Sequence, residues 1–298
     1  MNNLVNPGFR SIGANLQVGP LGYGCWRLVA MSTDAAAVCI ESAIDAGMNL
    51  IDTADVYGLD WGGSAFGEAE TLLGTVLKQN PSLRERMVLA SKGGITPGIP
   101  YDSSNLVALC EASLARLQTE HLDLYQIHRP DLLTHPEQVA AQLTALRASG
   151  KIGEVGVSNH RPEQTQALQS FLDFPIATQQ PEFSALRLDP LFDGTFDQCL
   201  QQGYQVINWS PLGGGALATG EGLAQNLRQA LDELAEREGV TRASIALAFT
   251  LAHPANPIAL VGSINPRRIT QARQALGVQL HRQDVYRIIE ASLGESLP

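Results

Sequence analysis

The chain has 298 residues, a length that a single α/β barrel commonly reaches as one domain. Hydrophobic residues make up 44% of it, and the formal net charge of -10 argues against a nucleic-acid-binding protein, because phosphate binding needs a basic face. The four cysteines lie far apart, without a CxxC pair or clustered histidines, which argues against a disulfide framework and a metal site. No apolar signal segment and no stretch long enough to cross a bilayer is visible, so we expect a cytoplasmic protein without membrane association.

Short apolar runs recur along the whole chain and predict β-strands. Most of them are continuously apolar rather than alternating, which is typical of parallel strands buried on both faces. The eight runs span residues 21–25, 48–54, 87–93, 122–128, 153–159, 176–183, 204–210 and 257–263.

Segments of helical period separate these runs. The first opens in a Ser/Thr/Asp cluster and stops at Gly47, so it carries a capping signal at each end. The predicted helices span residues 33–46, 104–117, 137–148, 162–172, 223–238, 244–252 and 266–276. This alternation favours one (β/α)8 TIM barrel domain over residues 1–298 rather than an open doubly wound sheet. We further expect an N-terminal hairpin within 11–20, across the barrel bottom, and an extra C-terminal helix from Arg282.

Ionisable residues follow three consecutive predicted strands. Asp52 ends the second strand and Tyr57 lies on the loop after it, while Lys92 and His128 end the third and fourth strands. Taken singly, each has an ordinary structural explanation, such as a helix cap, loop packing, a surface charge or a core histidine. Because the carboxyl ends of barrel strands share one mouth, however, the four side chains are expected to converge.

Together these four residues suit the reduction of a carbonyl group. Hydride addition requires a proton donor at the developing alkoxide, and a tyrosine has a pKa of roughly 10. An ammonium from Lys92, paired with Asp52, would lower the pKa of Tyr57 and make it a usable acid. His128 could position the carbonyl oxygen beside the Tyr57 hydroxyl.

Four motifs in the chain resemble the aldo-keto reductase superfamily, and the resemblance extends over essentially the whole sequence. They are IDTADVYG, SKGG, DLYQIHRPD and GEVGVSN. The resemblance implies that Asp52, Tyr57, Lys92 and His128, here called the tetrad, are catalytic and that Tyr57 is the acid. A histidine at position 128 implies carbonyl reduction, whereas a glutamate there would suggest double-bond reduction.

The resemblance also implies a site for NADPH, with NADH as a less preferred cofactor. Ser158, Asn159 and Gln180 would bind the nicotinamide carboxamide, and Trp209 would stack on its ring. Arg268 would meet the adenosine 2′-phosphate at a helix start. Two departures from the family pattern reduce the expected selectivity: Gly262 stands where a lysine is common, and Ala272 replaces an asparagine that holds the adenine. The remaining expected cofactor contacts are Gly24, Cys25, Trp26, Asp52, Ser210, Pro211, Leu212, Gly213, Gly262, Ser263 and Gln271.

The substrate is expected to be a small-molecule carbonyl compound in a pocket formed by Trp26, Tyr57, Trp61 and His128. We expect a monomer or a weak oligomer. Two other functions remain open at this point. One is an NADPH-binding, redox-sensing regulatory subunit with little turnover, and the other is a barrel aldolase that uses Lys92 as a Schiff-base amine.

Overall fold

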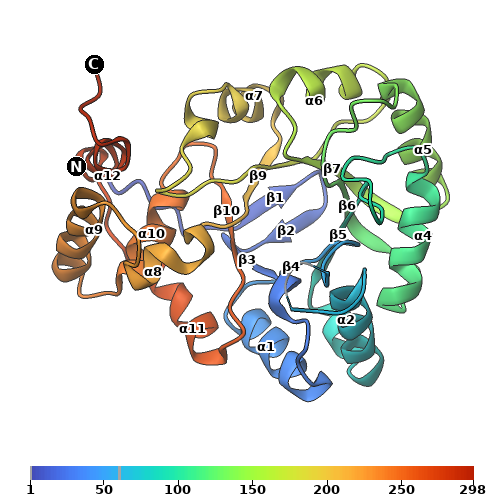
Figure 1. The fold of residues 1–298 in the computed structure, drawn as a ribbon, viewed down its shortest axis with the longest axis horizontal. Coiled ribbons are helices and arrows are strands. Elements are labelled where there is room, and N and C mark those ends of the chain that lie inside the picture. Colours follow the sequence, from blue (N-terminus) through green and yellow to red (C-terminus); the bar gives the residue numbers. More distant parts are fainter. Residues whose placement is uncertain (1, 60–61) are drawn as a thin grey trace.

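The computed structural model describes residues 2–59 and 62–298, and its centre is a closed barrel of parallel strands (Figure 1). The barrel closes where Leu260 pairs with Gly22, between the last strand and the first. All eight predicted strands are confirmed. They are β3 (Leu21–Gly24), β4 (Leu50–Asp52), β5 (Val88–Gly93), β6 (Leu122–Ile127), β7 (Ile152–Ser158), β8 (Thr178–Gln180), β9 (Gln205–Asn208) and β10 (Ile258–Val261).

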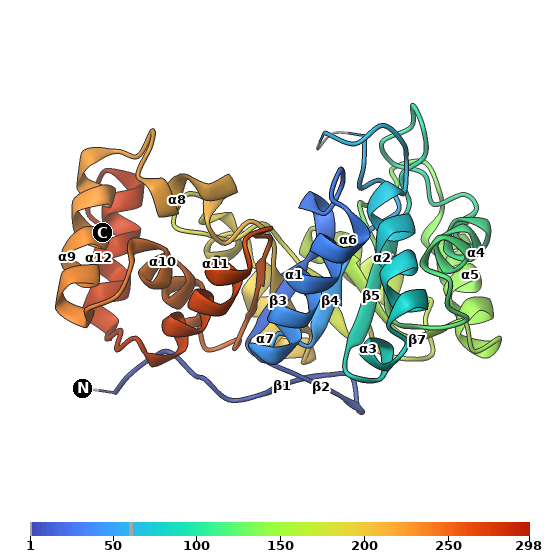
Figure 2. The ribbon, with the colours of Figure 1, turned by 90° about the horizontal axis from the view of Figure 1, so that it is seen from below.

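Helices cover the outside of the barrel. They are α1 (Thr33–Asp45), α2 (Glu68–Gln79), α3 (Ser82–Glu85), α4 (Leu106–Leu117), α5 (Pro136–Ala148), α6 (Pro162–Gln169), α7 (Thr195–Gln202), α8 (Ala216–Thr219), α9 (Gln225–Glu238), α10 (Arg242–Leu251), α11 (Pro266–Gln271) and α12 (Arg282–Leu293). The cap predicted for the first helix is present, since the Ser32 hydroxyl accepts the Ala35 N–H. The expected extra C-terminal helix is α12, which packs beside α9 (Figures 1 and 2).

One predicted helix was wrong in its extent. The segment 266–276 is α-helical only as α11 and continues as a 3-10 helix, η4 (Ala272–Gly277). The sequence pattern did not predict α2 or α7. In the described part of the chain, we find no helix with both the length and the apolar character needed to span a membrane.

The expected hairpin, β1 (Arg10–Ile12) with β2 (Leu16–Val18), lies across one end of the barrel (Figure 2). Ile12 and Val18 are fully buried and pack with the apolar residues inside the barrel, among them Leu50 and Leu124. The hairpin therefore closes the end opposite the carboxyl ends of the strands.

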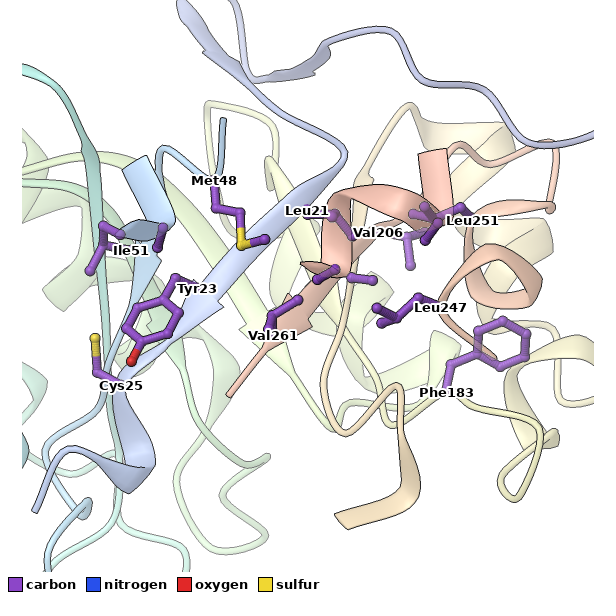
Figure 3. Close-up of a cluster of buried hydrophobic side chains, with 14 of the residues drawn as sticks. Leu21, Tyr23, Cys25, Met48, Ile51, Phe183, Val206, Leu247, Leu251 and Val261 are labelled. Carbon is purple, nitrogen blue, oxygen red and sulfur yellow. The ribbon is translucent and has the colours of Figure 1, made fainter. Parts of the chain in front are cut away.

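A second apolar layer fills the space between the barrel and its helices. Leu21 and Tyr23 of β3 point into this layer, together with Ile51 of β4 and Val206 of β9 (Figure 3). The inward-facing positions of the strands change character along the barrel axis: Leu50 is followed by Asp52. The same change from apolar to polar occurs along β5 and β6, so polar side chains collect at the carboxyl ends.

Candidate active site

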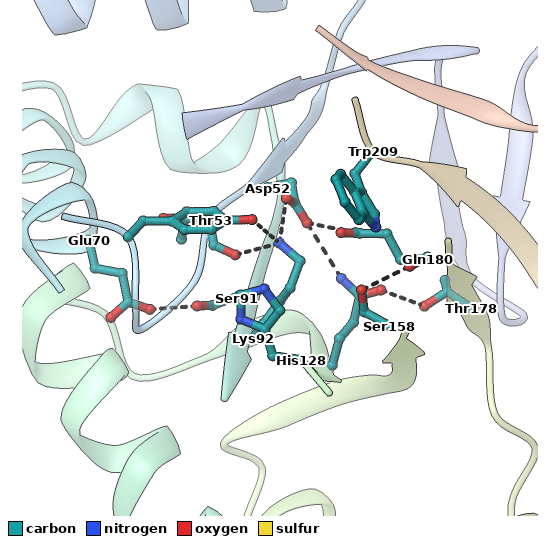
Figure 4. A network of polar contacts seen from close by, with 12 residues as sticks. Asp52, Thr53, Glu70, Ser91, Lys92, His128, Ser158, Thr178, Gln180 and Trp209 are labelled. Carbon is teal, nitrogen blue, oxygen red and sulfur yellow. Dashed lines mark hydrogen bonds and ion pairs between the residues drawn. The ribbon is translucent and has the colours of Figure 1, made fainter. Parts of the chain in front are cut away.

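The four tetrad side chains come together at the carboxyl ends of β4, β5 and β6. Figure 4 shows Asp52, Lys92 and His128 in this arrangement. The Lys92 ammonium donates to Asp52 Oδ2 at 2.6 Å, to the Thr53 carbonyl at 2.9 Å and to the Tyr57 hydroxyl at 3.2 Å. Lys92 and Asp52 are almost completely buried, whereas Tyr57 is partly exposed. The expected convergence of these residues is therefore present in the structure.

The charges in this cluster raise the pKa of Lys92, whereas the Lys92 charge lowers the pKa of Tyr57. Burial alone would lower the pKa of Lys92, but the Asp52 carboxylate and the Tyr57 hydroxyl outweigh it and raise that pKa to about 12. Burial raises the pKa of Tyr57, and the nearby Lys92 ammonium partly reverses this increase. Lys92 is thus a cation at neutral pH, held against the phenolic oxygen.

His128 lies next to Tyr57, with the two ring centroids 5.7 Å apart in an edge-to-face arrangement. Burial, reinforced by the positive charges of Lys92 and Arg129, lowers the pKa of His128 well below its ordinary value. The imidazole is therefore neutral near pH 7. Its Nδ1 has no hydrogen-bond partner within residues 2–59 and 62–298. A neutral imidazole can donate one N–H to an oxygen placed beside Tyr57.

Asp52 is held on its second oxygen by two amides. Gln180 Nε2 donates to Asp52 Oδ1 at 3.0 Å, and Gln126 Nε2 donates to the same atom at 3.4 Å (Figure 4). Gln126 was not among the predicted site residues. The sequence held one indication of its position. Residues two apart on a strand face the same side, and Gln126 precedes His128 by two residues.

Three of the residues expected to bind nicotinamide form one hydrogen-bonded group. Trp209 Nε1 donates to Asn159 Oδ1 at 3.0 Å, and Asn159 Nδ2 donates to the His128 carbonyl and to Ser158 Oγ. Ser158 Oγ in turn donates to the Gln180 carbonyl at 2.8 Å. Gln180 was expected to bind the nicotinamide carboxamide. In this structure its side chain faces Asp52 and hydrogen-bonds to that carboxylate.

The end of β3 is packed against the end of β10. Trp26, in the 3-10 helix η1 (Cys25–Arg27), lies so close to Gly262 that a β-carbon there would approach the indole nitrogen to 2.3 Å. Gly262, at the position where a lysine is common in the family, therefore leaves room for the Trp26 indole. Cys25 itself is fully buried, and burial raises the pKa of its thiol, so the expected cofactor contact at Cys25 is not exposed in this structure. Gly24 precedes η1, and its backbone lies beside the same indole.

The segment after β9 turns tightly across this mouth. Ser210 and Gly213 both have left-handed backbones, with φ of 54° and 55°, and the Ser210 hydroxyl accepts the Gly214 N–H. Arg27 lies over the Trp26 ring and donates to the Gly214 carbonyl at 2.9 Å. Pro211 and Leu212 lie within this turn, which is followed by η3 (Gly213–Gly215).

The residues expected at the adenosine end follow β10. Ser263 accepts a hydrogen bond from Tyr23 through its carbonyl, and Asn265 caps α11 by accepting the backbone N–H of Arg268. The Arg268 side chain is exposed, as is Gln271 at the end of α11. Trp61, expected in the substrate pocket, lies outside the described residues.

Comparison with known proteins agrees with this geometry. A family model described as the aldo/keto reductase family matches residues 20–292. The chain is 45% identical to a 6-dehydroglucose reductase of Novosphingobium aromaticivorans, in an alignment that covers 98% of each protein. It is 37% identical to the oxidoreductase YdhF of Escherichia coli, covering 92% of this chain and 94% of YdhF.

Two further matches extend this result. A 6-dehydroglucose reductase of Agrobacterium fabrum is 33% identical, with 96% of this chain and 98% of that protein covered. The crystal structure of a thermostable aldo-keto reductase, Tm1743, with the inhibitor epalrestat superimposes with a TM-score of 0.81 at 24% identity, over 95% of this chain and 99% of that one, and shows the same fold. This chain belongs to the aldo/keto reductase family, and it is an oxidoreductase of the class that reduces carbonyl groups.

Proposed function

We propose that this protein uses NADPH to reduce an aldehyde or ketone to the alcohol, with Tyr57 as the proton donor. One observation carries the proposal: the Lys92 ammonium lies 3.2 Å from the Tyr57 hydroxyl and is anchored by Asp52 at 2.6 Å. A cation held this close favours the phenolate, so Tyr57 is a stronger acid than its burial alone would allow.

Reduced nicotinamide, when bound, supplies a hydride to the carbonyl carbon. As negative charge develops on the carbonyl oxygen, Tyr57 donates its proton to that oxygen, and Lys92 stabilises the phenolate that remains. The neutral His128 donates a hydrogen bond to the same oxygen and orients it toward Tyr57. Lys92 stays protonated because acceptors hold its Nζ, and this argues against the Schiff-base alternative, which needs a free amine.

The chemistry of the surrounding residues fits a nicotinamide dinucleotide. Trp209 is partly exposed and offers an aromatic face beside the amide of Asn159. Arg268 is exposed at the start of α11, where a guanidinium suits the 2′-phosphate that distinguishes NADPH from NADH. We therefore propose NADPH as the preferred cofactor and NADH as a weaker one. Among the site residues that the structure describes, none favours the redox-sensing alternative.

For the substrate we propose a polyhydroxylated aldehyde of the 6-dehydroglucose type. Two relatives, at 45% and 33% identity, carry the name 6-dehydroglucose reductase, and both match almost the full chain. Reduction of the C6 aldehyde of such a sugar yields a primary alcohol, which is the reaction that Tyr57 and His128 suit.

The test is the loss of NADPH absorbance with 6-dehydroglucose and with 4-nitrobenzaldehyde, measured for the native protein and for Tyr57→Phe. Removing the proton donor should lower kcat by a factor of about a hundred or more, while NADPH binding, followed by fluorescence, is retained. Binding of NADPH without turnover of any aldehyde would contradict the reductase proposal and favour the sensor. Turnover of only 4-nitrobenzaldehyde would contradict the substrate class alone.

A further inference from the structure

Four inward-facing positions form a row across neighbouring strands, and the row begins at Lys92 of the tetrad. The strand register pairs Lys92 of β5 with Gln126 of β6, Gln126 with Gly156 of β7, and Gly156 with Thr178 of β8. The side chains of Lys92, Gln126 and Thr178 are all fully buried. Since Lys92 is one member of this row, the other members are placed to influence it.

Gly156 leaves the space that lets this row connect. A β-carbon at position 156 would lie 1.9 Å from Thr178 Oγ1 and 2.9 Å from Gln126 Cγ. Without it, the Gln126 side chain reaches across β7, and the Thr178 hydroxyl donates to Gln126 Oε1 at 3.0 Å. A side chain at position 156 would separate the two groups.

The Asp52 carboxylate sets the direction of the Gln126 amide, because a carboxylate only accepts hydrogen bonds and a hydroxyl can donate or accept. The Nε2 group faces Asp52 Oδ1, 3.4 Å away, and the Thr178 hydroxyl donates to Oε1 and holds the amide in this position. The reverse orientation would place an amide oxygen against a buried carboxylate, which is repulsive. Asp52 is thus held by Lys92 on one oxygen and by Gln126 and Gln180 on the other.

We propose that Gln126, anchored by Thr178, is a positioning residue that fixes the Asp52 carboxylate and, through it, the Lys92 ammonium beside Tyr57. This inference deepens the proposed function and rests on it. Neither residue touches the reacting atoms, because both act on Lys92 through Asp52. Loss of the amide would let Asp52 rotate and would loosen the contact between Lys92 and Tyr57.

The consequence for acidity has a definite sign. The Lys92 charge lowers the pKa of Tyr57, so a looser contact raises that pKa. Other titratable groups face this pair: His128 from β6, Cys25 from η1 and Asp55 from the loop after β4. His128 stays neutral because its pKa is lowered, and burial raises the pKa values of the Cys25 thiol and the Asp55 carboxyl. The alkaline limb of carbonyl reduction therefore reports mainly on the coupled Tyr57 and Lys92 pair.

The kinetic experiment compares Thr178→Val, Thr178→Ser and Gln126→Leu with the native protein. Thr178→Val and Gln126→Leu should lower kcat about tenfold and move the alkaline limb of kcat upward by about half a pH unit or more, with NADPH affinity unchanged. Thr178→Ser keeps the hydroxyl and should restore the native profile. Thr250→Val is the matched control, because it removes another fully buried hydroxyl, on α10, which donates to the Leu247 carbonyl.

A second readout does not need turnover. The lysines of this chain are Lys78, Lys92 and Lys151, so 15N-lysine labelling gives a simple spectrum. Lys78 is exposed and Lys151 is partly exposed, whereas buried Lys92 should give a sharp, slowly exchanging Nζ signal. That signal should broaden or shift in Thr178→Val and Gln126→Leu, and stay native in Thr178→Ser and Thr250→Val.

The outcomes distinguish the positioning role of Gln126 and Thr178 from the proposed carbonyl reduction. A native pH profile and a native Lys92 signal in both Thr178→Val and Gln126→Leu would overturn the positioning role. Equal loss of activity in Thr178→Ser, or in Thr250→Val, would also overturn it, because packing and not the hydroxyl would be responsible. If the native protein reduces no carbonyl compound, the proposed function fails, and the Lys92 signal still decides whether the amide holds the ammonium.

Discussion

At the scale of single residues, Asp55 is a buried carboxyl that the proposed chemistry does not use. It is fully buried, and neither of its oxygens has a hydrogen bond of normal geometry to the described part of the chain. Burial and the nearby Glu70 carboxylate raise its pKa well above the ordinary value, and the Arg116 and Lys92 charges offset this only in part.

This raised pKa predicts a stability cost that depends on pH. In the unfolded chain Asp55 ionises near pH 3.9, about the ordinary aspartate value, whereas the fold favours the neutral acid. Native stability is therefore lost as pH rises from that value toward the folded pKa. Asp55→Asn should remove the cost, so its gain in Tm over the native protein should grow between about pH 4 and neutrality. Thermal unfolding at a series of pH values measures this, with the exposed Asp173→Asn as the control. A gain that does not change with pH would show that Asp55 is not the cause.

The tetrad was predictable from sequence because each member ends or follows a clearly apolar strand. Gln126 was predictable in part, from its two-residue spacing to His128. Its partnership with Thr178 was not, because lateral register depends on how the barrel closes, and no local pattern encodes that. The contact of Trp26 with Gly262 escaped prediction for the same reason.

At the scale of elements, the N-terminal hairpin shows what closes the barrel. Ile12 of β1 is fully buried against the interior residues, while Ser11 beside it on the same strand faces solvent. Ile12→Ala should cost about 2–5 kcal/mol of unfolding free energy, because it leaves a cavity that the rigid barrel cannot fill. KM and kcat should hardly change, since the tetrad lies at the opposite end. Chemical denaturation and steady-state kinetics measure both, and Ser11→Ala should change neither. A large loss of kcat in folded Ile12→Ala would contradict this separation.

The two long helices missing from the sequence prediction have physical reasons to be inconspicuous. α2 follows Gly67, whose left-handed φ of 77° replaces a side-chain cap, and it contains Gly74. Gly74 is needed there because a β-carbon would lie 2.1 Å from the Arg116 carbonyl of α4. α7 likewise starts at a left-handed glycine, Gly194, and carries few apolar residues. A side-chain cap, one of the two usual signals of a helix start, is missing in both helices, although the apolar residues of both follow a helical period.

At the scale of the whole molecule, the barrel interior is divided along its axis. Apolar residues fill the half closed by the hairpin, and polar residues fill the half that opens at the carboxyl ends. The alternation of strands and helices was predictable because a parallel barrel buries each strand on both faces, so every strand leaves an apolar run. The same division predicts that variants of the apolar half act on stability and variants of the polar half act on activity.

The proposed cofactor site joins residues that are far apart in sequence, from Ser158 to Arg268, so binding should stabilise the whole barrel. A ligand that binds only the folded state at a hundredfold excess over its Kd adds about 2.7 kcal/mol, which for a protein of this size corresponds to a Tm increase of about 4 °C.

Arg268→Ala should weaken the binding of NADPH about ten- to a hundredfold and that of NADH hardly at all, because only NADPH carries the 2′-phosphate. At one fixed concentration the NADPH-induced shift should therefore shrink in Arg268→Ala, whereas exposed Arg273→Ala, on η4, should keep the native shift. An equal loss for both cofactors in Arg268→Ala would place Arg268 away from the 2′-phosphate. The absence of any shift with either cofactor in the native protein would overturn the nicotinamide site itself.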